Sequence, residues 1–495
     1  MVFDNSGVVR GEDGVARYTG LARNVVRGFA DAVAAHPDRT AVVELDGPTA
    51  TYRELWDGAA RVAGGLRAAG VGPGDRVAVG LPNGLAWMLA FWGTQLAGAV
   101  VVPLNTRLAP RERDFVVADS GAAVVIDTAD LPDGDPVEPA DPAHTDVAAL
   151  FYTSGTTGRP KGAVLTQECL LSSAENVQRC RELDRDAHHV SLVSVPLFHV
   201  TGCCSQMVTQ VLMAGTTVLM PRFSPAAFLA AVAEHRVALL TSVPTIYELV
   251  LRHPDLATTD LSSVRALSYG GAPMAPELVH RLRVAFPGVR LGNGFGLSET
   301  SALATFLPDA WTDDHADSVG FPAPVVDVDL DRPDPDTGVG ELLVRGPNVA
   351  TGYWGDPART AETFRHGWLH TGDLATIDAE GLVRIVDRAK DMINRGGENV
   401  YSVEVENALA EHPDVLEVAV VGVPDDVMGE KVGAVLLVRE PLDLAEFAAF
   451  ARHRLADYKV PQFVRVLDGP LPRNAGGKVL KGPLRTAEGW TPVPR

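Results

Sequence analysis

Lysine is scarce in this chain of 495 residues. The 43 basic residues are almost all arginines, and the six lysines are Lys161, Lys390, Lys431, Lys459, Lys478 and Lys481. Lysine and arginine are not interchangeable where a compact point charge is needed, so each lysine is a candidate for a specific role. The 63 acidic residues give a net charge of −20, which argues against a protein whose main task is to grip nucleic acid or an anionic membrane.

Cysteine is sparse as well. The four cysteines are Cys169, Cys180, Cys203 and Cys204. Their spacing resembles neither a disulfide framework nor a CxxC pair. We therefore expect a reducing compartment and a cytoplasmic protein. His199 with Cys203 would be only half of a metal site. Residues 1–20 are polar and lack the apolar core of a signal peptide.

Charge is absent from Val77 to Thr106, and most of Leu85–Leu104 is apolar. A membrane span would need an unbroken stretch of this length. Here Gly93–Gln95 and Gly98 interrupt the stretch before another apolar run. We expect a buried helix, a stop at glycine and a buried strand.

Short apolar runs and amphipathic patterns alternate along most of the chain. Thr51 and Glu54 form a capping-box pattern ahead of an amphipathic run that Gly70 ends. The predicted strands are Arg76–Gly80, Val100–Pro103, Ala123–Ile126, Ala148–Tyr152, Val190–Val195, Thr217–Met220, Leu239–Ser242 and Arg265–Tyr269. Most are continuous apolar runs, typical of strands buried on both faces. Helical patterns between them, such as Pro225–His235 and Ala275–Phe286, predict an α/β fold with mostly parallel sheets.

From about residue 338 the pattern changes. Short strands between Gly and Asp turns, including Glu341–Arg345 and Leu382–Val386, lead to a cluster of charges at Asp387–Asp391. The rest predicts a small α+β domain with helices and strands at Val403–Ala410, Val415–Val421, Val432–Val438, Leu444–Arg454 and Phe463–Val466. We therefore expect a large N-terminal domain of several subdomains over residues 1–388 and a small C-terminal domain over residues 389–495.

The segment Tyr152–Gly162, YTSGTTGRPKG, directly follows one of the apolar runs. Its three hydroxyl side chains, the backbone N–H groups that glycine leaves accessible, and Lys161 suit a phosphate group. It is not a Walker A loop, because Lys161 is followed by Gly162 rather than by Ser or Thr. A flexible turn would need neither the hydroxyl groups nor one of six lysines.

This loop resembles the signature of the adenylate-forming superfamily, which includes acyl-CoA synthetases, nonribosomal-peptide adenylation domains and luciferases. The resemblance extends from about Ala35 to Leu484, with further motifs in the family's order. They are Pro196–His199 (PLFH), Ser268–Pro273 (SYGGAP), Asn293–Glu299 (NGFGLSE), Thr371–Asp373 (TGD), Asp387–Arg388, Arg395–Val400 (RGGENV) and Pro472–Lys478 (PRNAGGK). One such motif would be weak evidence, whereas the ordered set is specific.

The resemblance implies an ATP site. Asp373 and Arg388 would hold the ribose, and Glu299 would hold Mg²⁺ near the phosphates. Phe295 stands where the family usually has Tyr and keeps a flat face for adenine, and Ser298 keeps a hydroxyl where Thr is common. The implied ATP and AMP ligands are Thr153, Ser154, Gly155, Thr156, Thr157, Gly158, Lys161, Gly271, Ala272, Pro273, Asn293, Gly294, Phe295, Gly296, Ser298, Asp373, Arg388 and Lys478.

The implied reaction has two steps. A substrate carboxylate attacks the α-phosphate of ATP to give acyl-AMP and pyrophosphate, and the thiol of coenzyme A then displaces AMP. The carboxylate is already ionised, so positioned cations and hydroxyl groups matter more than a general base. The catalytic residues implied are Lys478, His199, Thr153, Lys161 and Glu299, with Mg²⁺ as cofactor and ATP and CoA as co-substrates.

The resemblance implies an acyl pocket lined by four segments, Val200–Gln206, Ser242–Tyr247, Ser268–Pro273 and Gly292–Ser298. None of them contains Asp, Glu, Lys or Arg. A dicarboxylate such as malonate, or an amino acid, would need a charged partner there. We therefore expect a neutral apolar acid, with either a medium or long aliphatic chain or a bulky ring system. We interpret the pocket glycines as leaving space, and Val200, Val243, Ile246 and Tyr269 as apolar wall. The residues assigned to the pocket are His199, Val200, Gly202, Cys203, Val243, Tyr269, Gly270, Gly292 and Leu297, with Gly271 as a further space-giving glycine.

The resemblance also implies that the small C-terminal domain is mobile and forms the channel through which the thiol of coenzyme A reaches the acyl group. Gly396, Gly397 and Glu398 would form the channel for the pantetheine arm, and Lys390 would be the hinge about which this loop replaces Lys478. His199 would gate the channel, or else be an ordinary hydrogen-bonded loop histidine. Ser402, where a proline is common, is predicted to N-cap the next helix, and Lys481 is interpreted as an exposed lysine.

We expect a stand-alone acid–thiol ligase whose partners are a carboxylic acid, ATP and CoA, with no nucleic acid and no integral membrane contact. The main alternative is an acyl-AMP ligase that loads a separate carrier protein. A luciferase-like oxidoreductase and a catalytically silent binding protein are further alternatives. The sequence leaves a homodimer open.

Overall fold

The structure is a computed structural model that describes residues 2–153, 159–272, 274–396, 398–473 and 479–494. The chain divides into two compact units. The first comprises Met1–Val328, Leu343–His370 and Gly381–Val383, and the second comprises Asp329–Leu342, Thr371–Glu380 and Arg384–Arg495.

A nine-stranded sheet in the first unit has the order β16-β15-β14-β13-β12-β10-β11-β3-β4. Its six inner strands run parallel, and β4, β15 and β16 are added antiparallel. The strands are β3 (Thr40–Glu44), β4 (Thr49–Thr51), β10 (Val190–Val193), β11 (Thr216–Leu219), β12 (Leu239–Ser242), β13 (Ala266–Gly270), β14 (Arg290–Phe295), β15 (Thr305–Leu307) and β16 (Phe321–Pro322). Four of these inner strands, β10 to β13, match predicted apolar runs, because both of their faces are covered. The strands β3 and β14 were not predicted.

A second sheet of this unit has the order β7-β5-β6-β8-β9. The strands are β5 (Arg76–Val79), β6 (Val100–Pro103), β7 (Ala122–Ile126), β8 (Val147–Thr153) and β9 (Lys161–Thr166). All pairs are parallel except β8 with β9, which form an antiparallel hairpin. The loop of this hairpin therefore begins at the carboxyl end of a parallel strand, where α/β proteins usually bind ligands.

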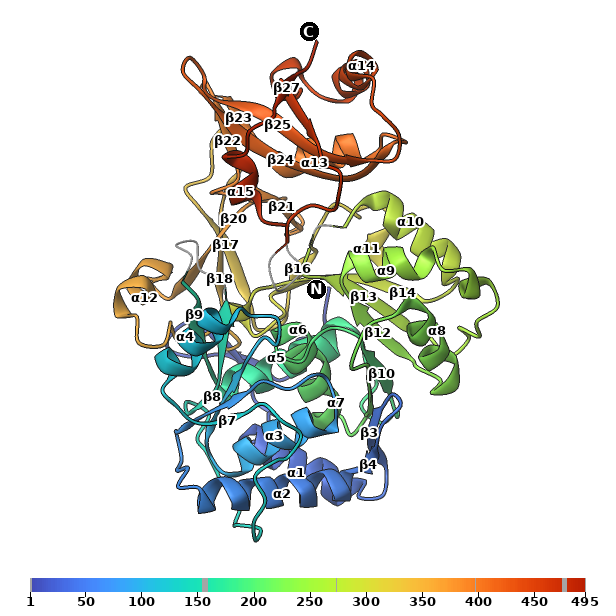
Figure 1. Ribbon diagram of the computed structural model, residues 1–495. Coiled ribbons are helices and arrows are strands. Elements are labelled where there is room, and N and C mark those ends of the chain that lie inside the picture. The colour runs from blue at the N-terminus through green and yellow to red at the C-terminus, as the bar shows by residue number, and fades with distance from the viewer. Residues whose placement is uncertain (1, 154–158, 273, 397, 474–478, 495) are drawn as a thin grey trace. The chain divides into compact units, whose positions relative to one another are not determined.

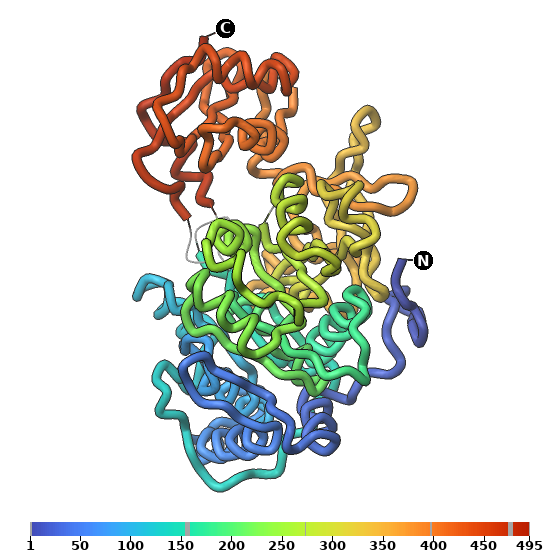
Figure 2. Tube along the Cα trace, turned by 90° about the vertical axis from the view of Figure 1, so that its right-hand side faces the viewer, coloured from blue at the N-terminus to red at the C-terminus, as the bar shows by residue number. Residues whose placement is uncertain are grey.

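Helices make up much of the rest of this unit. They are α1 (Val25–Ala35), α2 (Tyr52–Ala68), α3 (Leu85–Leu96), α4 (Pro110–Ser120), α5 (Gln167–Cys180), α6 (Val200–Gly202), α7 (Thr209–Leu212), α8 (Pro225–Glu234), α9 (Pro244–Leu251), α10 (Pro276–Ala285), α11 (Asp309–Thr312) and α12 (Pro357–Thr363). The π-helix η1 (Cys203–Val208) joins α6 to α7, and η2 (Pro254–Ala257) and η3 (Ser298–Thr300) are 3₁₀ turns. Helices α8, α9 and α10 lie on one face of the nine-stranded sheet (Figure 1), and α1, α2 and α3 pack together (Figures 1 and 2).

The charge-free stretch folds as predicted. It forms α3, a turn at Gly98 with φ of +71°, and β6. Trp87, Phe91 and Trp92 of α3 are fully buried, so the apolar run is explained by the protein core. Among the residues described, no helix combines the length and hydropathy that a membrane crossing requires. The capping box at Thr51 and Glu54 is also confirmed, with both of its hydrogen bonds at the start of α2.

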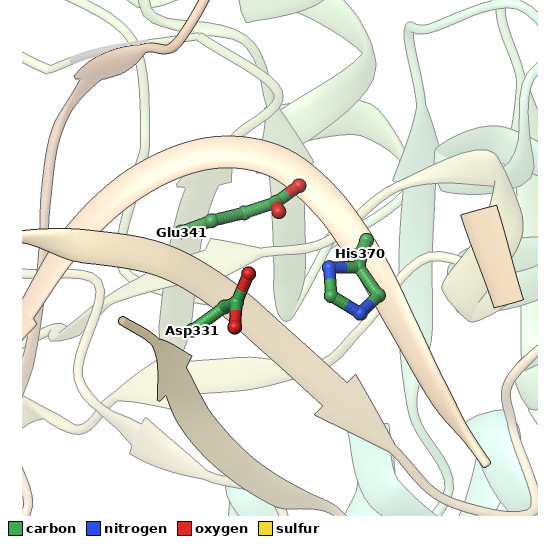
Figure 3. A group of neighbouring side chains, drawn as sticks. All are labelled: Asp331, Glu341 and His370. Atoms are coloured by element: carbon green, nitrogen blue, oxygen red, sulfur yellow. The ribbon is translucent and has the colours of Figure 1, made fainter. Parts of the chain in front are cut away.

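Two further sheets are smaller, and the strands of the second one are divided between the two units. A ribbon pairs β1 (Val8–Arg10) with β2 (Ala16–Tyr18). A five-stranded sheet contains β17 (Asp327–Asp331), β18 (Gly340–Arg345), β19 (Phe364–Arg365), β20 (Trp368–Ile377) and β21 (Val383–Arg388). Figure 3 shows three polar side chains of this sheet, Asp331 on β17, Glu341 on β18 and His370 on β20. Glu341 accepts a hydrogen bond of 2.9 Å from the backbone N–H of Gly372, so its carboxylate supports the part of β20 that precedes Asp373.

The second unit is built around a six-stranded sheet, with the order β23-β22-β25-β26-β27 and with β24 paired to β25. Its elements are β22 (Ile393–Arg395), β23 (Glu398–Val400), α13 (Ser402–Ala410), β24 (Val415–Asp425), β25 (Gly429–Val438), α14 (Leu444–Arg454), η4 (Asp457–Lys459), β26 (Phe463–Val466), α15 (Lys481–Arg485) and β27 (Thr491–Pro492). The predicted helices and strands of this region are present, and β24 and β25 extend beyond their predicted ends. The hairpin β22–β23 was not predicted, because its strands are short and polar.

Candidate active site

The hairpin β8–β9 positions the first group of candidate residues. Thr153 and Lys161 are paired across the ladder, at the base of the loop that the sequence identifies as a phosphate cradle. The hydroxyl of Thr153 is buried and has no hydrogen-bond partner within the described residues. Ser154, Gly155, Thr156, Thr157 and Gly158 of the loop lie outside the described residues.

Lys161 lies against Glu299 of the 3₁₀ turn η3. Its ammonium is 2.9 Å from Glu299 Oε1, and the Glu299 side chain is only 9% exposed. Burial alone would raise the pKa of Glu299, but the charge of Lys161 and hydrogen bonds from Lys161 and Tyr353 outweigh it and hold that pKa below its ordinary value. Glu299 is therefore an ionised carboxylate inside the protein, at the base of the loop.

Tyr353 completes this group and was missed by the sequence analysis. Its hydroxyl donates to Glu299 Oε1 at 2.7 Å and accepts a hydrogen bond from the ammonium of Lys161. The only signal in the sequence is a pair of aromatic residues after Gly352, in a segment without charge or periodicity. Only the fold shows that this segment lies beside β9.

Strands β13 and β14 position the two segments predicted to bind the nucleotide. They approach so closely that a Cβ on Gly270 would lie 2.1 Å from the carbonyl oxygen of Gly294. A Cβ on Gly296 would lie 1.6 Å from the carbonyl oxygen of Ala302. These glycines are therefore required by backbone packing. Asn293, predicted to contact the nucleotide, donates its side-chain amide to the carbonyl of Ser318 at 2.9 Å.

Phe295 and Ser298 follow directly at the end of β14 and in η3, and both are partly exposed. Gly271 turns the chain after β13 with φ of +76°, and Gly271 and Ala272 are exposed. Pro273 lies outside the described residues.

His199 precedes α6 and is the candidate gate. Burial, and to a smaller extent the charge of Arg107, lowers the pKa of His199 to about 4, so its imidazole is neutral at pH 7. The ring lies 4.7 Å from that of Phe198, measured between centroids. It makes no hydrogen bond within the part of the chain that the structure describes, so nothing there supports the alternative of a hydrogen-bonded loop histidine.

Three of the glycines interpreted as leaving space for an acyl group do not do so. A Cβ on Gly202 would lie 2.4 Å from the carbonyl oxygen of Pro196, and the space beside Gly270 is filled by the backbone of Gly294. A Cβ on Gly292 would lie 2.3 Å from Cζ of Phe306. The ring of Phe306 thus occupies the space above Gly292. It also lines a cavity of about 200 Å³ together with Ser268 and Leu291.

Two other residues assigned to the acyl pocket lie in the core. Tyr269 is 1% exposed and packs beneath α8, α9 and α10. Its neighbour Gly270 faces the other side of the sheet, because side chains alternate along a strand. Cys203 is fully buried in the core of the first unit. Val243 remains close to Gly271, with its Cγ1 3.7 Å from where a Cβ on that glycine would lie. Val200 follows His199 and is 7% exposed. Leu297 precedes Ser298 and is partly buried.

In the second unit, Asp373 and Arg388 come together from β20 and β21. Arg388 Nε is 2.8 Å from Asp373 Oδ1, and the side chain of Asp373 is 3% exposed. The strand β20 just before Asp373 contains Gly372 at φ of +73°, and the N–H of Ala389 donates to the carbonyl of Gly372 at 3.0 Å. The fold thus places the two predicted ribose ligands side by side.

The predicted hinge and thiol loop also lie in this unit. Lys390 is exposed, and Arg485 of α15 donates to its carbonyl at 2.6 Å. Gly396, at φ of +64°, lies in the turn of the hairpin β22–β23, next to Glu398, which pairs with Arg395 at 3.3 Å. Gly397 and Lys478 lie outside the described residues.

Two predictions about the second unit were wrong. The N-cap of α13 is Tyr401, and Ser402 is the first residue of the helix, where its hydroxyl contacts Asp387 at 3.0 Å. The carboxylate of Asp387 accepts from the N–H of Ser402 and so takes the capping role. Lys481 is not exposed: its side chain is 15% exposed and its ammonium lies 2.7 Å from Glu406.

Family comparison agrees with the motifs. The family model "AMP-binding enzyme" matches residues 29–135 and 127–354. The model of the "AMP-binding enzyme C-terminal domain" matches residues 404–478. Together these matches cover most of the chain.

Relatives of similar length are acyl-CoA synthetases. A feruloyl-CoA synthase from an Amycolatopsis species is 42% identical over 91% of this chain and 96% of its own length. A long-chain-fatty-acid–CoA ligase from Bacillus subtilis is 32% identical over 92% of this chain and 93% of its own length. The o-succinylbenzoate CoA synthetase of Bacillus subtilis, 31% identical, has been solved with its acyl-adenylate intermediate (TM-score 0.85, 93% of this chain and 98% of that one). It has also been solved with ATP and a magnesium ion, in a structure that covers 91% of this chain and 98% of its own with a TM-score of 0.83.

Proposed function

This chain belongs to the family of AMP-binding enzymes, and from that premise we propose that it activates an apolar, ring-containing acid at a site centred on Lys161 and Glu299. It is an enzyme that uses ATP to form an acyl-CoA. In the first step a carboxylate oxygen bonds to the α-phosphorus of ATP as pyrophosphate leaves. In the second step the sulfur of CoA bonds to the acyl carbon, AMP leaves and the thiol proton is released.

The contact of 2.9 Å between Lys161 and Glu299, at the base of the loop, is the observation that carries the proposed ATP site. Lys161 offers a compact cation to phosphate oxygens, and the unpartnered hydroxyl of Thr153 a hydrogen bond. Magnesium fits here, because Glu299 is an ionised carboxylate and Mg²⁺ is usually held by one or two carboxylates together with substrate phosphates. When bound with ATP, the ion would neutralise charge on the phosphate oxygens.

The remaining roles follow the same proposal. Asp373 accepts hydrogen bonds from ribose hydroxyls, with Arg388 holding its carboxylate. Phe295 offers a flat face to adenine. Lys478 stabilises charge at the α-phosphate, and the loop of Gly396 and Gly397 admits the thiol arm.

We favour a compact ring-containing acid because of Phe306. Its ring fills the space above Gly292, which shortens any pocket along β14 and disfavours a long chain. The pocket segments carry no charge, so a second carboxylate or an ammonium would be buried without a partner. The feruloyl-CoA synthase at 42% identity, higher than the 32% of the long-chain ligase, supports the same preference.

A panel of acids tests this function. AMP release is measured with Mg·ATP and with CoA, a carrier protein or neither, for ferulate, cinnamate, octanoate, palmitate, malonate and phenylalanine. We expect CoA-dependent AMP release that is fastest with the aromatic acids. Fastest turnover with malonate or phenylalanine would contradict the uncharged pocket, and fastest turnover with palmitate would contradict the role of Phe306. AMP release with a carrier protein but not with CoA would favour the acyl-AMP ligase.

A further inference from the structure

The hydroxyl of Tyr353 lies between the two charged groups at the base of the phosphate loop. It donates to Glu299 Oε1 at 2.7 Å and accepts from the ammonium of Lys161. That ammonium also lies 4.2 Å from the centre of the Tyr353 ring, within the range of a cation–π interaction. The hydroxyl of Tyr353 thus contacts both Lys161 and Glu299, and its ring lies close to Lys161 as well.

Tyr353 is itself firmly placed. It is 5% exposed, and its ring packs edge-on against Phe364 with 5.5 Å between centroids. Its backbone N–H donates to the hydroxyl of Thr360 at 2.9 Å. Such a side chain has little rotamer freedom left, so the position of its hydroxyl group is fixed by the fold.

The segment around Tyr353 connects the two elements that carry the charged groups. The N–H of Trp354 donates to the carbonyl of Gly162 on β9 at 2.8 Å, and the N–H of Ala350 donates to the carbonyl of Glu299 at 2.7 Å. Lys161 and Glu299 are therefore both tied, through backbone as well as side chain, to the same short segment.

We propose that Tyr353 is a positioning residue that holds the carboxylate of Glu299 and the ammonium of Lys161 in the geometry that receives Mg·ATP. The proposal rests on the proposed function, in which those two groups bind the metal and the phosphates. The hydroxyl fixes the direction of one carboxylate oxygen, and the ring face limits where the ammonium lies. Tyr353 acts through these two residues and needs no contact with substrate.

Two substitutions separate the hydroxyl from the ring. Tyr353→Phe removes both hydroxyl contacts and keeps the ring against Lys161 and Phe364, whereas Tyr353→Leu removes the ring as well. A matched control is Tyr18→Phe, because the Tyr18 hydroxyl also makes a buried hydrogen bond, of 2.6 Å to Asn176, outside this group. Binding of ATP with magnesium is measured by calorimetry on the full chain without acid or CoA, so that no turnover occurs.

We expect Tyr353→Phe to weaken Mg·ATP binding about tenfold, as for loss of a hydrogen bond to a charged group, and Tyr353→Leu to weaken it further. Tyr18→Phe should leave it unchanged. The KM for the acid should stay within twofold of the parent value in Tyr353→Phe, and thermal unfolding of that variant should match that of Tyr18→Phe. Unchanged Mg·ATP affinity in Tyr353→Phe, or an equal loss in Tyr18→Phe, would overturn the proposal.

A double-mutant cycle with Glu299→Gln separates this inference from the proposed function. If Tyr353 acts through Glu299, Tyr353→Phe should cost less than threefold once Glu299→Gln is present. A full tenfold cost in that background would overturn the positioning role while leaving the ATP site intact. If Glu299→Gln alone leaves Mg·ATP affinity unchanged, the assignment of Glu299 in the proposed function fails, and the inference about Tyr353 fails with it.

Discussion

Most of the lysine side chains that the structure describes form ion pairs. Four of them lie within 3 Å of a carboxylate: Lys161 with Glu299, Lys431 with Asp425, Lys459 with Glu404 and Lys481 with Glu406. A compact ammonium suits such contacts, because it can approach one carboxylate oxygen without the planar geometry of a guanidinium. The scarcity of lysine was thus a useful signal, although it did not distinguish the site lysine Lys161 from the structural Lys481.

The neutral imidazole of His199 makes stability depend on pH. Its pKa is lowered to about 4 in the folded chain, whereas an unfolded histidine titrates near 6.5. The unfolded state therefore binds the proton first as pH falls, and stability is lost between about pH 6.5 and pH 4. We expect the free energy of unfolding, measured by urea denaturation, to fall by about 2 kcal/mol more between pH 7.5 and pH 5 in the parent than in His199→Phe. An equal loss in both proteins would contradict a buried neutral ring, and His453→Gln, at an exposed histidine, serves as control.

Asp373 is expected to bind ribose rather than to hold the backbone of β20 in place. That part of the strand is already supported by Gly372 at positive φ and by Glu341, whose carboxylate accepts from the N–H of Gly372. Asp373→Ala should therefore raise the KM for ATP by tenfold or more in a protein that is still folded by circular dichroism, with a lower melting temperature because Arg388 loses its buried partner. A variant that is destabilised, but whose folded fraction binds ATP normally, would assign Asp373 a structural role alone.

Phe306 is expected to set the length of the acid. It pairs with Gly294 in the β14–β15 ladder and lies over Gly292. Phe306→Leu should raise kcat/KM for octanoate relative to ferulate by about tenfold, because a smaller side chain leaves part of the space above Gly292 open. The milder change is chosen since removing a buried aromatic ring entirely costs about 3–5 kcal/mol. An unchanged ratio, in a variant that is folded, would show that the acyl group does not approach Phe306.

At the scale of elements, the helix α15 is fixed to the start of α13 by a buried polar cluster. Lys481 contacts Glu406 at 2.7 Å and the hydroxyl of Ser402 at 2.6 Å, and Ser402 contacts Asp387. Burial raises the pKa of both Glu406 and Asp387, and Lys481 offsets part of that effect. The cluster connects α15 to the residue just before Arg388.

Removing the lysine should leave buried carboxylates without their cation. We expect Lys481→Met to lower the free energy of unfolding by about 3–5 kcal/mol, as for one partner of a buried pair. Adding Glu406→Gln should recover part of that loss. The control is Lys459→Met, since Glu404 is 42% exposed and such a pair contributes less than about 1 kcal/mol. Equal losses in the two lysine variants, measured by urea denaturation, would contradict the buried cluster.

The helices and strands that form continuous apolar runs could be predicted from the sequence. Short polar strands and residues whose role depends on tertiary contacts could not. Strands such as β6 and β12, and helices such as α3 and α14, were found where periodicity placed them, because burial on both faces or on one stripe leaves a clear pattern. The polar hairpin β22–β23 leaves no such pattern. Tyr353 could not be found, because its role depends on tertiary contact with Lys161 and Glu299. Tyr269 and Gly292 were misread, because the sequence does not tell which face of a strand meets the ligand or what lies above a glycine.

At the scale of the whole molecule, the two chemical steps draw on different residues of the C-terminal region. Gly396 lies in the turn of the hairpin β22–β23, and Lys478 follows β26 along the chain, just before α15. By the family resemblance, Lys478 serves the phosphates and the loop of Gly396 and Gly397 serves the thiol. Because Gly397 and Lys478 lie about eighty residues apart along the chain, each can be altered without changing the other motif.

The half-reactions should therefore respond separately. Lys478→Ala should reduce acyl-AMP formation on the order of 10²–10³-fold, as for loss of one group that stabilises developing charge. It should still convert supplied acyl-AMP and CoA into thioester. Gly397→Leu should do the reverse, because a bulky side chain obstructs the thiol arm without reaching the phosphates. ATP–pyrophosphate exchange reports the first step, and thioester formation from synthetic acyl-AMP reports the second. Equal loss of both steps in both variants would mean that one arrangement of the C-terminal region serves the whole reaction.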